Sequence, residues 1–323
     1  MRLLITGGAG FIGSNFIHYI LGEHQDWKIT NLDKLTYAGN PKNFEGLAED
    51  RHLFVKGDIA DADTVNTAIS KGIDVIVNFA AESHVDRSID DPAPFIENNI
   101  KGTQVLLEAA RKHGITQFIQ VSTDEVYGSL GPAGVFHEDS PLAPNSPYSA
   151  SKASADLLCR AYFKTYGLPV IVTRCSNNFG PRQFPEKFIP VTITCALENR
   201  PVPLYGDGLN VRDWLYVADH CRALEAVILN GREGEIYNIG GGRELTNLEL
   251  AEEILRQLGK PSSLIRHVND RPGHDRRYAV DSGKIQRELG WKPRYDFARA
   301  LQETIQWYAG NLGWWGKSEV WPS

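Results

Sequence analysis

Residues 3 to 13 read Leu3-Leu4-Ile5-Thr6-Gly7-Gly8-Ala9-Gly10-Phe11-Ile12-Gly13. The apolar run from Leu3 to Thr6 predicts a buried strand, and the pattern from about Phe11 to Leu21 predicts a helix. Glycines between the two allow a tight turn, a close approach to a pyrophosphate and close packing of the helix on the strand. The helix N-terminus also offers free amides to phosphates. A purely structural turn is the alternative interpretation, because glycine triplets are common.

The alternation of strand and helix continues through the first half of the chain. Unbroken apolar, β-branched runs separated by segments of helix length are typical of a parallel sheet covered on both faces. The predicted class is therefore α/β, a Rossmann-type doubly wound parallel sheet. The predicted strands are Leu3 to Thr6, Ile29 to Leu32, Leu53 to Lys56, Val75 to Phe79, Phe118 to Ser122, and Val170 to Arg174.

A smaller C-terminal α/β region is predicted after Arg174, where closely spaced prolines rule out long unbroken helices. We expect one domain at residues 1–174 and a second at 175–323, with segments near 211–240 returning to the first. A capping box beginning at Thr246 predicts a helix to about Leu258, and a later helix is expected from Phe297 to Leu312. We expect the tryptophans of the tail to pack against the body of the protein; they are Trp314, Trp315 and Trp321.

Composition narrows the classes of partner. The 323 residues include 34 basic and 40 acidic ones, a net charge of -6, and no stretch concentrates Lys or Arg as a nucleic-acid surface would require. The apolar run at the N-terminus is too short for a signal peptide or a membrane span, so we expect a cytoplasmic location. The cysteines are spaced too widely for a metal or disulfide pattern, and we expect buried thiols and no metal site.

The second predicted strand ends at Asp33, twenty residues after Gly13. A carboxylate at this spacing accepts a hydrogen bond from a ribose 2′-hydroxyl and repels the 2′-phosphate of NADP. The predicted cofactor is therefore NAD. Asp58, after the third predicted strand, lies where an adenine edge could be read, and a helix cap is the alternative interpretation.

Tyr148 and Lys152 are four residues apart, so they share a face if the segment is helical, and Pro147 is typical of a helix start. A Lys ammonium close to a Tyr hydroxyl favours the phenolate and lowers a pKa that starts near ~10, as a general base requires. Because the Tyr-x-x-x-Lys pattern also arises by chance, a surface pair is the alternative.

An acidic run begins where the fifth predicted strand ends: Ser122-Thr123-Asp124-Glu125-Val126-Tyr127-Gly128. Ligands of open parallel sheets collect at the carboxyl ends of the strands, so this run points at the same crevice as the cofactor. Adjacent carboxylates face opposite sides of a regular strand, and both reach one ligand only if the chain turns there. An acidic loop with a helix-capping Asp is the alternative interpretation.

These motifs together resemble the extended short-chain dehydrogenase/reductase family, and within it the dTDP-glucose 4,6-dehydratases. The resemblance covers almost the whole chain. Besides the glycine loop, Thr123-Asp124-Glu125 and the Tyr148/Lys152 pair, it rests on Asp33-Lys34-Leu35-Thr36-Tyr37-Ala38-Gly39-Asn40, Ala80-Ala81-Glu82-Ser83-His84-Val85-Asp86-Arg87-Ser88, Ser176-Asn177-Asn178-Phe179-Gly180-Pro181 and Asp270-Arg271-Pro272-Gly273-His274-Asp275.

The resemblance implies a catalytic role for five residues. Tyr148 is expected to act as base for the sugar 4-hydroxyl, and Lys152 to orient the nicotinamide ribose and lower the pKa of Tyr148. Thr123 replaces the usual serine beside the 4-oxygen. Asp124 is expected to protonate the leaving 6-hydroxyl, and Glu125 to take the proton from carbon 5.

The resemblance also implies two binding sets. For NAD they are Gly7, Gly10, Phe11, Ile12, Gly13, Asp33, Lys34, Leu35, Thr36, Asp58, Ile59, Phe79, Ala80, Ala81, Ser83, Asn98, Tyr148, Lys152 and Asn178. For the nucleotide-sugar substrate, dTDP-glucose, they are Ser83, Thr123, Asp124, Glu125, Asn177, Lys187, Phe188, Pro203, Tyr205, Arg212, Asn247, Asp270, Arg271 and His274. On this reading residues 1–174 bind NAD and residues 175–323 mainly bind the nucleotide sugar. A homodimer is expected as well.

Three other readings stay open at this point. One is a UDP-sugar 4-epimerase of the same fold, which needs Tyr148, Lys152 and NAD but neither carboxylate. Another is a GDP-mannose or CDP-glucose dehydratase, because the choice of base rests on the resemblance alone. The third is a non-catalytic NAD-binding regulator, whose usual sign is loss of the Tyr, the Lys or the acidic pair.

Overall fold

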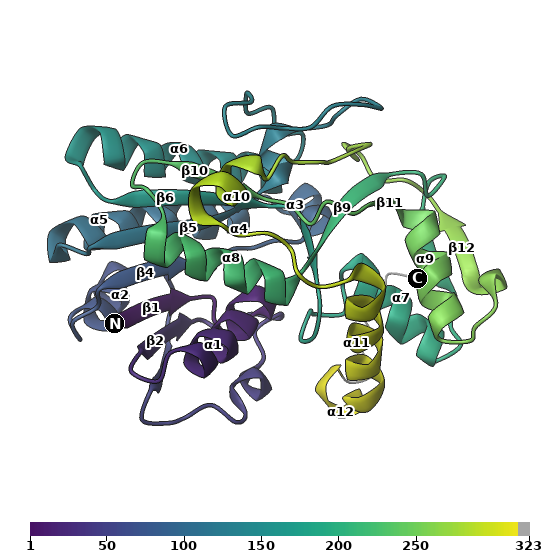
Figure 1. Ribbon diagram of the computed structural model, residues 1–323, viewed down its shortest axis with the longest axis horizontal. Helices are drawn as coiled ribbons and strands as arrows, with labels where there is room; N and C mark the ends of the chain where they lie inside the picture. The colour runs from purple at the N-terminus through teal and green to yellow at the C-terminus, as the bar shows by residue number, and fades with distance from the viewer. Residues whose placement is uncertain (316–323) are drawn as a thin grey trace.

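A parallel sheet of seven strands forms the centre of the computed structural model, which describes residues 1–315 (Figure 1). The strand order is β10-β6-β5-β4-β1-β2-β3, and every neighbouring pair is parallel. The strands are β1 (Arg2–Thr6), β2 (Lys28–Asp33), β3 (His52–Lys56), β4 (Val75–Asn78), β5 (Gln117–Thr123), β6 (Val170–Cys175) and β10 (Ile236–Ile239). The predicted doubly wound α/β fold is confirmed, and the six predicted strands are present.

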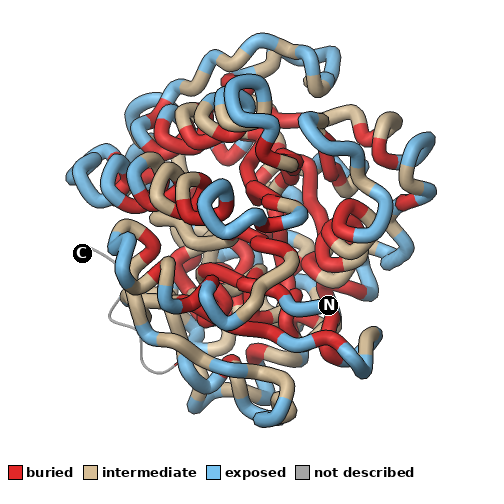
Figure 2. The backbone as a smooth tube through the Cα atoms, turned by 90° about the vertical axis from the view of Figure 1, so that its left-hand side faces the viewer, coloured by how far each residue is buried: buried red, intermediate tan, exposed pale blue. Residues whose placement is uncertain are grey.

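Helices cover both faces of the sheet because successive strand residues alternate in direction. Leu3 and Ile5 pack with Phe16 of α1 (Phe11–Glu23) and Leu224 of α8 (Val217–Asn230). Leu4 faces the other way, toward the core cluster formed with helices α2, α5 and α6. Figure 2 shows the result, with buried chain running through the interior and exposed chain around it. The helices of the second face are α2 (Ala62–Ile69), α5 (Thr103–His113) and α6 (Pro147–Tyr166).

A smaller region lies beside the carboxyl ends of the sheet strands, on the right of Figure 1. It contains a three-stranded sheet in the order β11-β9-β7 and a two-stranded sheet of β12 and β8. Its core joins Phe179, Trp214, Ile254 and Leu301. Its elements are β7 (Asn177–Phe179), α7 (Phe188–Leu197), β8 (Val202–Tyr205), β9 (Val211–Tyr216), β11 (Glu244–Thr246), α9 (Asn247–Gln257), η4 (Ser262–Leu264), β12 (Ile265–Val268), α11 (Phe297–Gly310) and α12 (Leu312–Trp315).

The remaining elements are short or irregular. A continuous helical segment precedes α5, and its π-helical part, η2, is not visible in the apolar pattern of the sequence. The elements are η1 (Pro41–Phe44), α3 (Val85–Asp90), α4 (Ala93–Phe95), η2 (Ile96–Gly102), η3 (Asp124–Tyr127) and α10 (Gly283–Leu289).

Several local predictions can be compared with these elements. The capping box at Thr246 is formed with Glu249, as predicted. The helix expected from Phe297 to Leu312 ends at Gly310, and a short helix follows it. Trp315 is buried and Trp314 packs edge-on against Trp307, whereas Trp321 lies outside the described residues.

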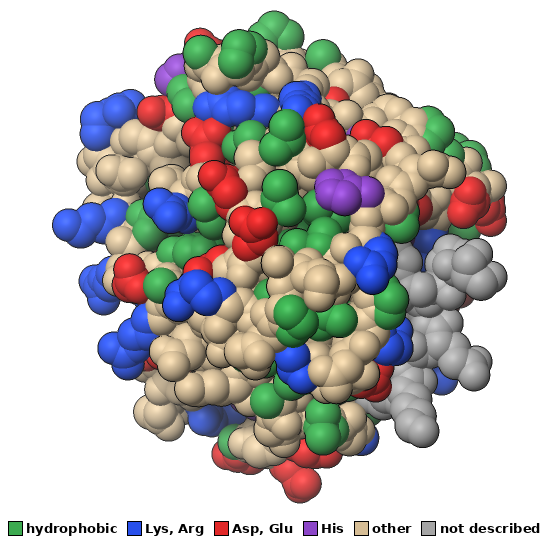
Figure 3. Space-filling model, turned by 90° about the vertical axis from the view of Figure 1, so that its right-hand side faces the viewer, with side chains coloured by type: hydrophobic (Ala, Val, Ile, Leu, Met, Phe, Trp, Pro, Cys, Tyr) green, Lys and Arg blue, Asp and Glu red, His purple; other side chains and the backbone are tan. Residues whose placement is uncertain are grey.

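The four cysteines are free and buried, as predicted. No helix within residues 1–315 is long and apolar enough to cross a membrane. On the face drawn in Figure 3, Lys and Arg side chains are interspersed with Asp and Glu and do not gather into one basic patch.

Candidate active site

A cavity opens where the strand order reverses, between the carboxyl ends of β1 and β4, which is where ligands of doubly wound sheets bind. Its volume is about 410 Å³, and it extends from the glycine loop to segments of the smaller region. Every predicted site residue lines it except Leu35 and Asp270. The structure therefore brings together residues from 7 to 274.

The backbone of the glycine loop is packed too closely on its neighbours to carry a side chain at Gly7 or Gly13. A Cβ atom at Gly7, whose φ is +71°, would lie 2.7 Å from the Ala80 nitrogen, and one at Gly13 would lie 2.5 Å from the Gly7 oxygen. Gly10 is the N-cap of α1 and supplies no side-chain cap. The first amides of α1 therefore stay available to an anion, as a diphosphate site requires.

Asp33 closes the same end of the cavity. Its Oδ2 accepts from the Ala9 amide at 2.9 Å and its Oδ1 from the Leu35 amide at 2.8 Å. Burial raises the pKa of Asp33, and these two amides oppose the rise. Since an ionised carboxylate has about four acceptor positions, Asp33 can still accept hydroxyl donors. Leu35 contributes its backbone amide from behind Asp33 and does not line the cavity.

Asp58 and Asn98 also line the cavity, and Lys34 contacts both of them. Lys34 Nζ lies 3.4 Å from Asp58 Oδ2 and also donates to Asn98 Oδ1. Asp58 Oδ1 accepts from the Ala60 amide at 2.9 Å, whereas Asp61 caps the following helix. The alternative reading of Asp58 as a helix cap is therefore wrong.

Tyr148 and Lys152 lie on the buried face of α6, which begins with Pro147 after the Ser146 cap. Lys152 Nζ donates to the Val121 carbonyl at 2.7 Å. Burial raises the pKa of Tyr148 well above its usual value, the charge of Glu125 adds to the rise, and a hydrogen bond with Thr123 opposes it. The direction is opposite to the one expected from Lys152 alone, because the sequence does not show how deeply the phenol is buried.

The chain turns immediately after β5, as the use of two adjacent carboxylates requires. Asp124 begins the 3-10 turn η3, which Thr123 caps through its hydroxyl. Burial raises the pKa of Asp124 well above its usual range, and the charge of Glu125 adds to this. Burial raises the pKa of Glu125 as well, but Arg271, Lys187 and Arg212 oppose the rise. Burial and the charge of Glu125 therefore favour the protonated form of Asp124, whereas three nearby cations favour the ionised form of Glu125.

The other end of the cavity is cationic. Lys187, Arg212 and Arg271 line it, together with His274, whose pKa is lowered by burial and by the charge of Arg271. The Arg212 guanidinium lies 4.4 Å from the centre of the Tyr278 ring and donates to the Asp275 carbonyl at 2.9 Å. Planar guanidinium groups suit paired phosphate oxygens. Asp270 lies outside the cavity lining, where its Oδ1 pairs with His274 Nδ1 at 2.6 Å.

Several polar residues that line the cavity are not among the predicted site residues, including Glu82, His84, Asp86, Gln183 and Glu186. Asp86 accepts from Arg271 at 3.1 Å and from Tyr205 at 3.0 Å. For Glu82, His84 and Asp86 the available signal was their place inside the motif 80–88, and for Glu186 it was the position beside Lys187, whereas Gln183 had neither signal.

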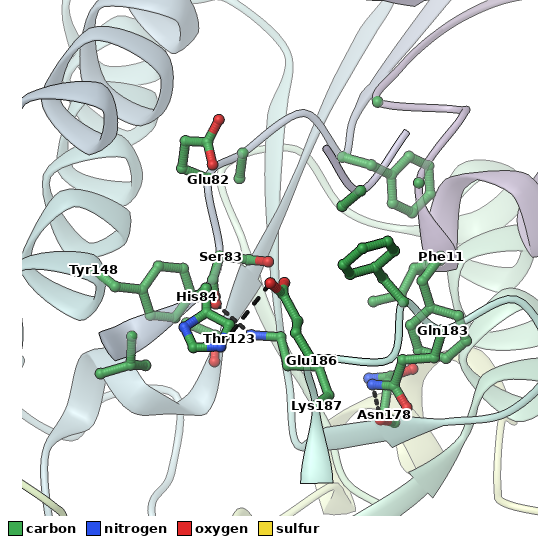
Figure 4. Close-up of a pocket in the computed structure, with 18 of the residues that line it drawn as sticks. Phe11, Glu82, Ser83, His84, Thr123, Tyr148, Asn178, Gln183, Glu186 and Lys187 are labelled. Carbon is green, nitrogen blue, oxygen red and sulfur yellow. Dashed lines mark hydrogen bonds and ion pairs between the residues drawn. The ribbon is translucent and has the colours of Figure 1, made fainter. Parts of the chain in front are cut away.

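Figure 4 shows how some of these groups converge. Tyr148, Thr123 and Lys187 point into the same part of the cavity. Lys187 Nζ donates to the Ser83 carbonyl at 2.6 Å, which joins the segment before α7 to the loop after β4. Tyr148, the Thr123 cap of the acidic turn and Lys187 are thus brought together from three different parts of the chain.

Known proteins match this chain over nearly its whole length. Residues 4–304 match the family described as GDP-mannose 4,6 dehydratase. A dTDP-glucose 4,6-dehydratase of Streptomyces niveus is 54% identical over 320 residues, which cover 98% of this chain and 95% of the relative. The dTDP-glucose 4,6-dehydratase DesIV of Streptomyces venezuelae, solved with NAD bound, is 53% identical with a TM-score of 0.95, covering 98% of this chain and 99% of that one.

A more distant match shows that the fold alone does not determine the activity. A UDP-glucose 4-epimerase of Thermotoga maritima has a TM-score of 0.90 at 30% identity, covering 97% of this chain and all of that one. Because one fold serves both activities, the choice between them depends on the residues of the site. By its family match and by its identity to the dehydratases, the chain belongs to the GDP-mannose 4,6 dehydratase family of extended short-chain dehydrogenases/reductases.

Proposed function

We propose that this chain is a dTDP-glucose 4,6-dehydratase, an NAD-dependent hydro-lyase that converts dTDP-glucose to dTDP-4-keto-6-deoxyglucose and water. One observation carries the proposal beyond the family: Asp124 and Glu125 lie on a turn beside Tyr148, one favoured as an acid and the other as a base. A 4-epimerase has no use for either carboxylate, and a non-catalytic regulator would have no reason to keep this pair with Tyr148 and Lys152. The identity to dTDP-glucose 4,6-dehydratases supports the same conclusion.

The cofactor is NAD, and the residues present fit it. The glycine loop leaves no room for a Cβ atom at Gly7, and Asp33 is placed to accept the ribose hydroxyls. When bound, NAD supplies a hydride acceptor for carbon 4, a hydride donor for carbon 6, and a positive charge that favours the Tyr148 phenolate.

The side chains divide the proton transfers between them. Tyr148 takes the proton of the 4-hydroxyl while Thr123 and Lys152 hold the groups around it. Carbon 5 becomes acidic only once carbon 4 is a ketone, so Glu125 acts second and takes that proton. Asp124 gives its proton to the leaving 6-hydroxyl, and water departs. Acids and bases with pKa values set apart by their surroundings suit such paired roles.

The direct test is incubation of the purified protein with dTDP-glucose and mass spectrometry of the product. We expect a nucleotide sugar lighter by one water. An epimer of unchanged mass would support the epimerase reading instead, and unaltered substrate would support the regulator. Parallel reactions with GDP-mannose and CDP-glucose test the choice of base.

Three broader expectations remain predictions. They are the division into an NAD-binding domain at 1–174 and a substrate domain at 175–323, a cytoplasmic location, and a homodimer. Support for the dimer comes from large apolar side chains that are more than half exposed, Leu157 of α6 and Ile96 of the adjoining helix. The mass of the native protein by light scattering tests it.

Asp33→Ala is expected to weaken NAD binding by about tenfold or more and to relax the rejection of NADP. The change removes an acceptor for the ribose hydroxyls and a charge that repels a 2′-phosphate. Asp33→Asn is the matched control, because it removes the charge but keeps an acceptor, and it should lose less NAD affinity. Titration of both cofactors into the cofactor-stripped protein measures this. An unchanged NAD/NADP ratio in Asp33→Ala would leave Asp33 a structural residue.

Arg212→Lys is expected to raise the KM for dTDP-glucose by roughly 10- to 100-fold, the effect of losing about 1.5–3 kcal/mol from hydrogen bonds to a charged group. The lysine keeps the charge but loses the planar fork, which also stacks on Tyr278 and holds the Asp275 carbonyl. Arg277→Lys is the control, because Arg277 pairs with Glu244 and does not line the cavity. Equal KM values for the two variants would remove Arg212 from substrate binding.

A further inference from the structure

A buried ion pair lies behind Tyr148 and Lys152, and none of the steps above uses it. Arg174 Nε of β6 donates to Asp156 Oδ2 of α6 at 2.9 Å, and the two side chains are only 4% and 2% exposed. Taking two charges out of water is costly, and well-packed apolar residues often serve stability equally well. Packing of α6 on the sheet does not by itself require a buried ion pair at this position.

Asp156 lies one helical turn beyond Lys152, which lies one turn beyond Tyr148, so all three share the buried face of α6. The groups whose charges act on Lys152 are Asp156 and Cys159 of its own helix and Cys175 of β6, while β5 contributes the neutral Val121 carbonyl. Burial raises the pKa of Cys175 to about 12 and that of Cys159 well above its usual value, so both are neutral thiols. Asp156 is the carboxylate in this set. Burial lowers the pKa of Lys152, and Asp156 opposes that effect.

The guanidinium of Arg174 also contacts Tyr127, which belongs to the turn that carries Asp124 and Glu125. Its Nη1 donates to the Tyr127 hydroxyl at 2.9 Å, and its Cζ lies 4.8 Å from the centre of the Tyr127 ring. Tyr127 is the last residue of η3, the turn that carries Asp124 and Glu125, and its hydroxyl donates to Asn238 Oδ1 at 2.8 Å. One guanidinium thus contacts both the helix of the base and the turn of the acidic pair.

Ser122 of β5 is the strand partner of Arg174 on β6, so it lies next to the ion pair. Burial raises the pKa of Asp156, and the charge of Arg174 and its hydrogen bond to Asp156 oppose the rise. Ser122 itself lines the cavity and precedes Thr123. The ion pair is therefore connected to the end of β5 as well as to α6 and η3.

We propose that Asp156 and Arg174 are positioning residues for the dehydration. Asp156 supplies the negative charge that keeps Lys152 an ammonium, and Arg174 holds the helix of Tyr148 and Lys152 in register with the turn of Asp124 and Glu125. This inference rests on the function proposed above.

The charge role is tested by the pH dependence of the oxidation step alone. The step is followed as near-ultraviolet absorbance of the reduced cofactor after mixing the holoenzyme with dTDP-glucose, in a Glu125→Gln background where elimination does not consume the signal. Without the Asp156 carboxylate the pKa of Lys152 falls further, so its ammonium is lost at lower pH. In Asp156→Asn the alkaline limb of the rate should therefore move to lower pH by about 1 unit or more.

Asp156→Asn leaves Arg174 without its counter-ion and can destabilise the fold. The double variant Asp156→Asn/Arg174→Gln removes both charges and leaves a neutral, hydrogen-bonding pair. The double variant also lacks the Asp156 carboxylate, so its alkaline limb should move in the same direction. An alkaline limb at the position of the Glu125→Gln background in the double variant would overturn the charge role. Absence of reduced cofactor in the background protein itself would instead count against the proposed function.

The register role is tested with Arg174→Lys and Tyr127→Phe. Both remove the hydrogen bond between Arg174 and Tyr127, and Arg174→Lys keeps a cation beside Asp156. In the otherwise unchanged holoenzyme each should slow dehydration by about 10- to 100-fold, as small misplacements do. The KM for dTDP-glucose and the alkaline limb of the oxidation should stay in place. Dehydration at the unmodified rate in Tyr127→Phe, or an equal rise in KM, would overturn this role.

Discussion

Glu125→Gln is expected to preserve the oxidation at carbon 4 and to abolish most of the elimination that follows. The amide keeps nearly the same shape, so dTDP-glucose still binds and Tyr148 still takes the proton of the 4-hydroxyl. The amide cannot act as a base for the carbon 5 proton. Removal of a positioned general base costs about 100- to 10,000-fold in rate, and dehydration should slow by that factor. Mixing the holoenzyme with dTDP-glucose should therefore build up the near-ultraviolet absorbance of reduced cofactor, with little dehydrated product.

Tyr148→Phe is the matched control for this experiment, because it removes the first base and leaves the second intact. It should show no reduced cofactor, since the oxidation never begins. The two variants thus separate the steps by absorbance alone. The assignment of Glu125 as a separate, later base fails if Glu125→Gln dehydrates at the unmodified rate, or if both variants stop before the cofactor is reduced.

The sequence predicts best those features that depend on residues close together in the chain. Asp33 is fixed by its distance from the glycine loop and by the end of a strand, and its amide partners at Ala9 and Leu35 lie within that same stretch. The helix of Tyr148 and Lys152 follows from Pro147 and the spacing of four residues. In both cases neighbouring residues of the chain determine which face a side chain takes, so periodicity and capping signals are sufficient.

What the sequence does not show is pairing between distant segments. Asp86 and Arg271 are 185 residues apart, and Arg174 and Asp156 belong to different elements that meet only when α6 packs on the sheet. The direction of the pKa of Tyr148 could not be predicted either, because it depends on how deeply the fold buries the phenol. Leu35 and Asp270 were predicted as site residues, but they do not line the cavity. Leu35 donates its amide to Asp33, and Asp270 pairs with His274, and these two partners do line it.

Asp124→Asn should lose dehydration to a similar extent as Glu125→Gln, about 100- to 10,000-fold, but with the opposite pH signature. Its amide can donate a hydrogen bond to the leaving 6-hydroxyl but cannot give up a proton as an acid. Oxidation at carbon 4 should survive, so reduced cofactor should accumulate here as well. The two carboxyl groups act in one step, and their pH dependence tells them apart.

The sign of each limb follows from the protonation state that each carboxyl must have. Glu125 must be ionised, so the rate of elimination falls as the pH drops through the pKa of Glu125, which burial raises. Asp124 must be protonated, so the rate falls as the pH rises through the pKa of Asp124. Burial and the charge of Glu125 both raise the pKa of Asp124. Because the two groups interact, each limb belongs to the pair. The residual elimination in Asp124→Asn should lose the alkaline limb and that in Glu125→Gln the acid limb. Product formation measured across pH decides the matter, and an alkaline limb that persists unchanged in Asp124→Asn would mean that Asp124 is not the acid.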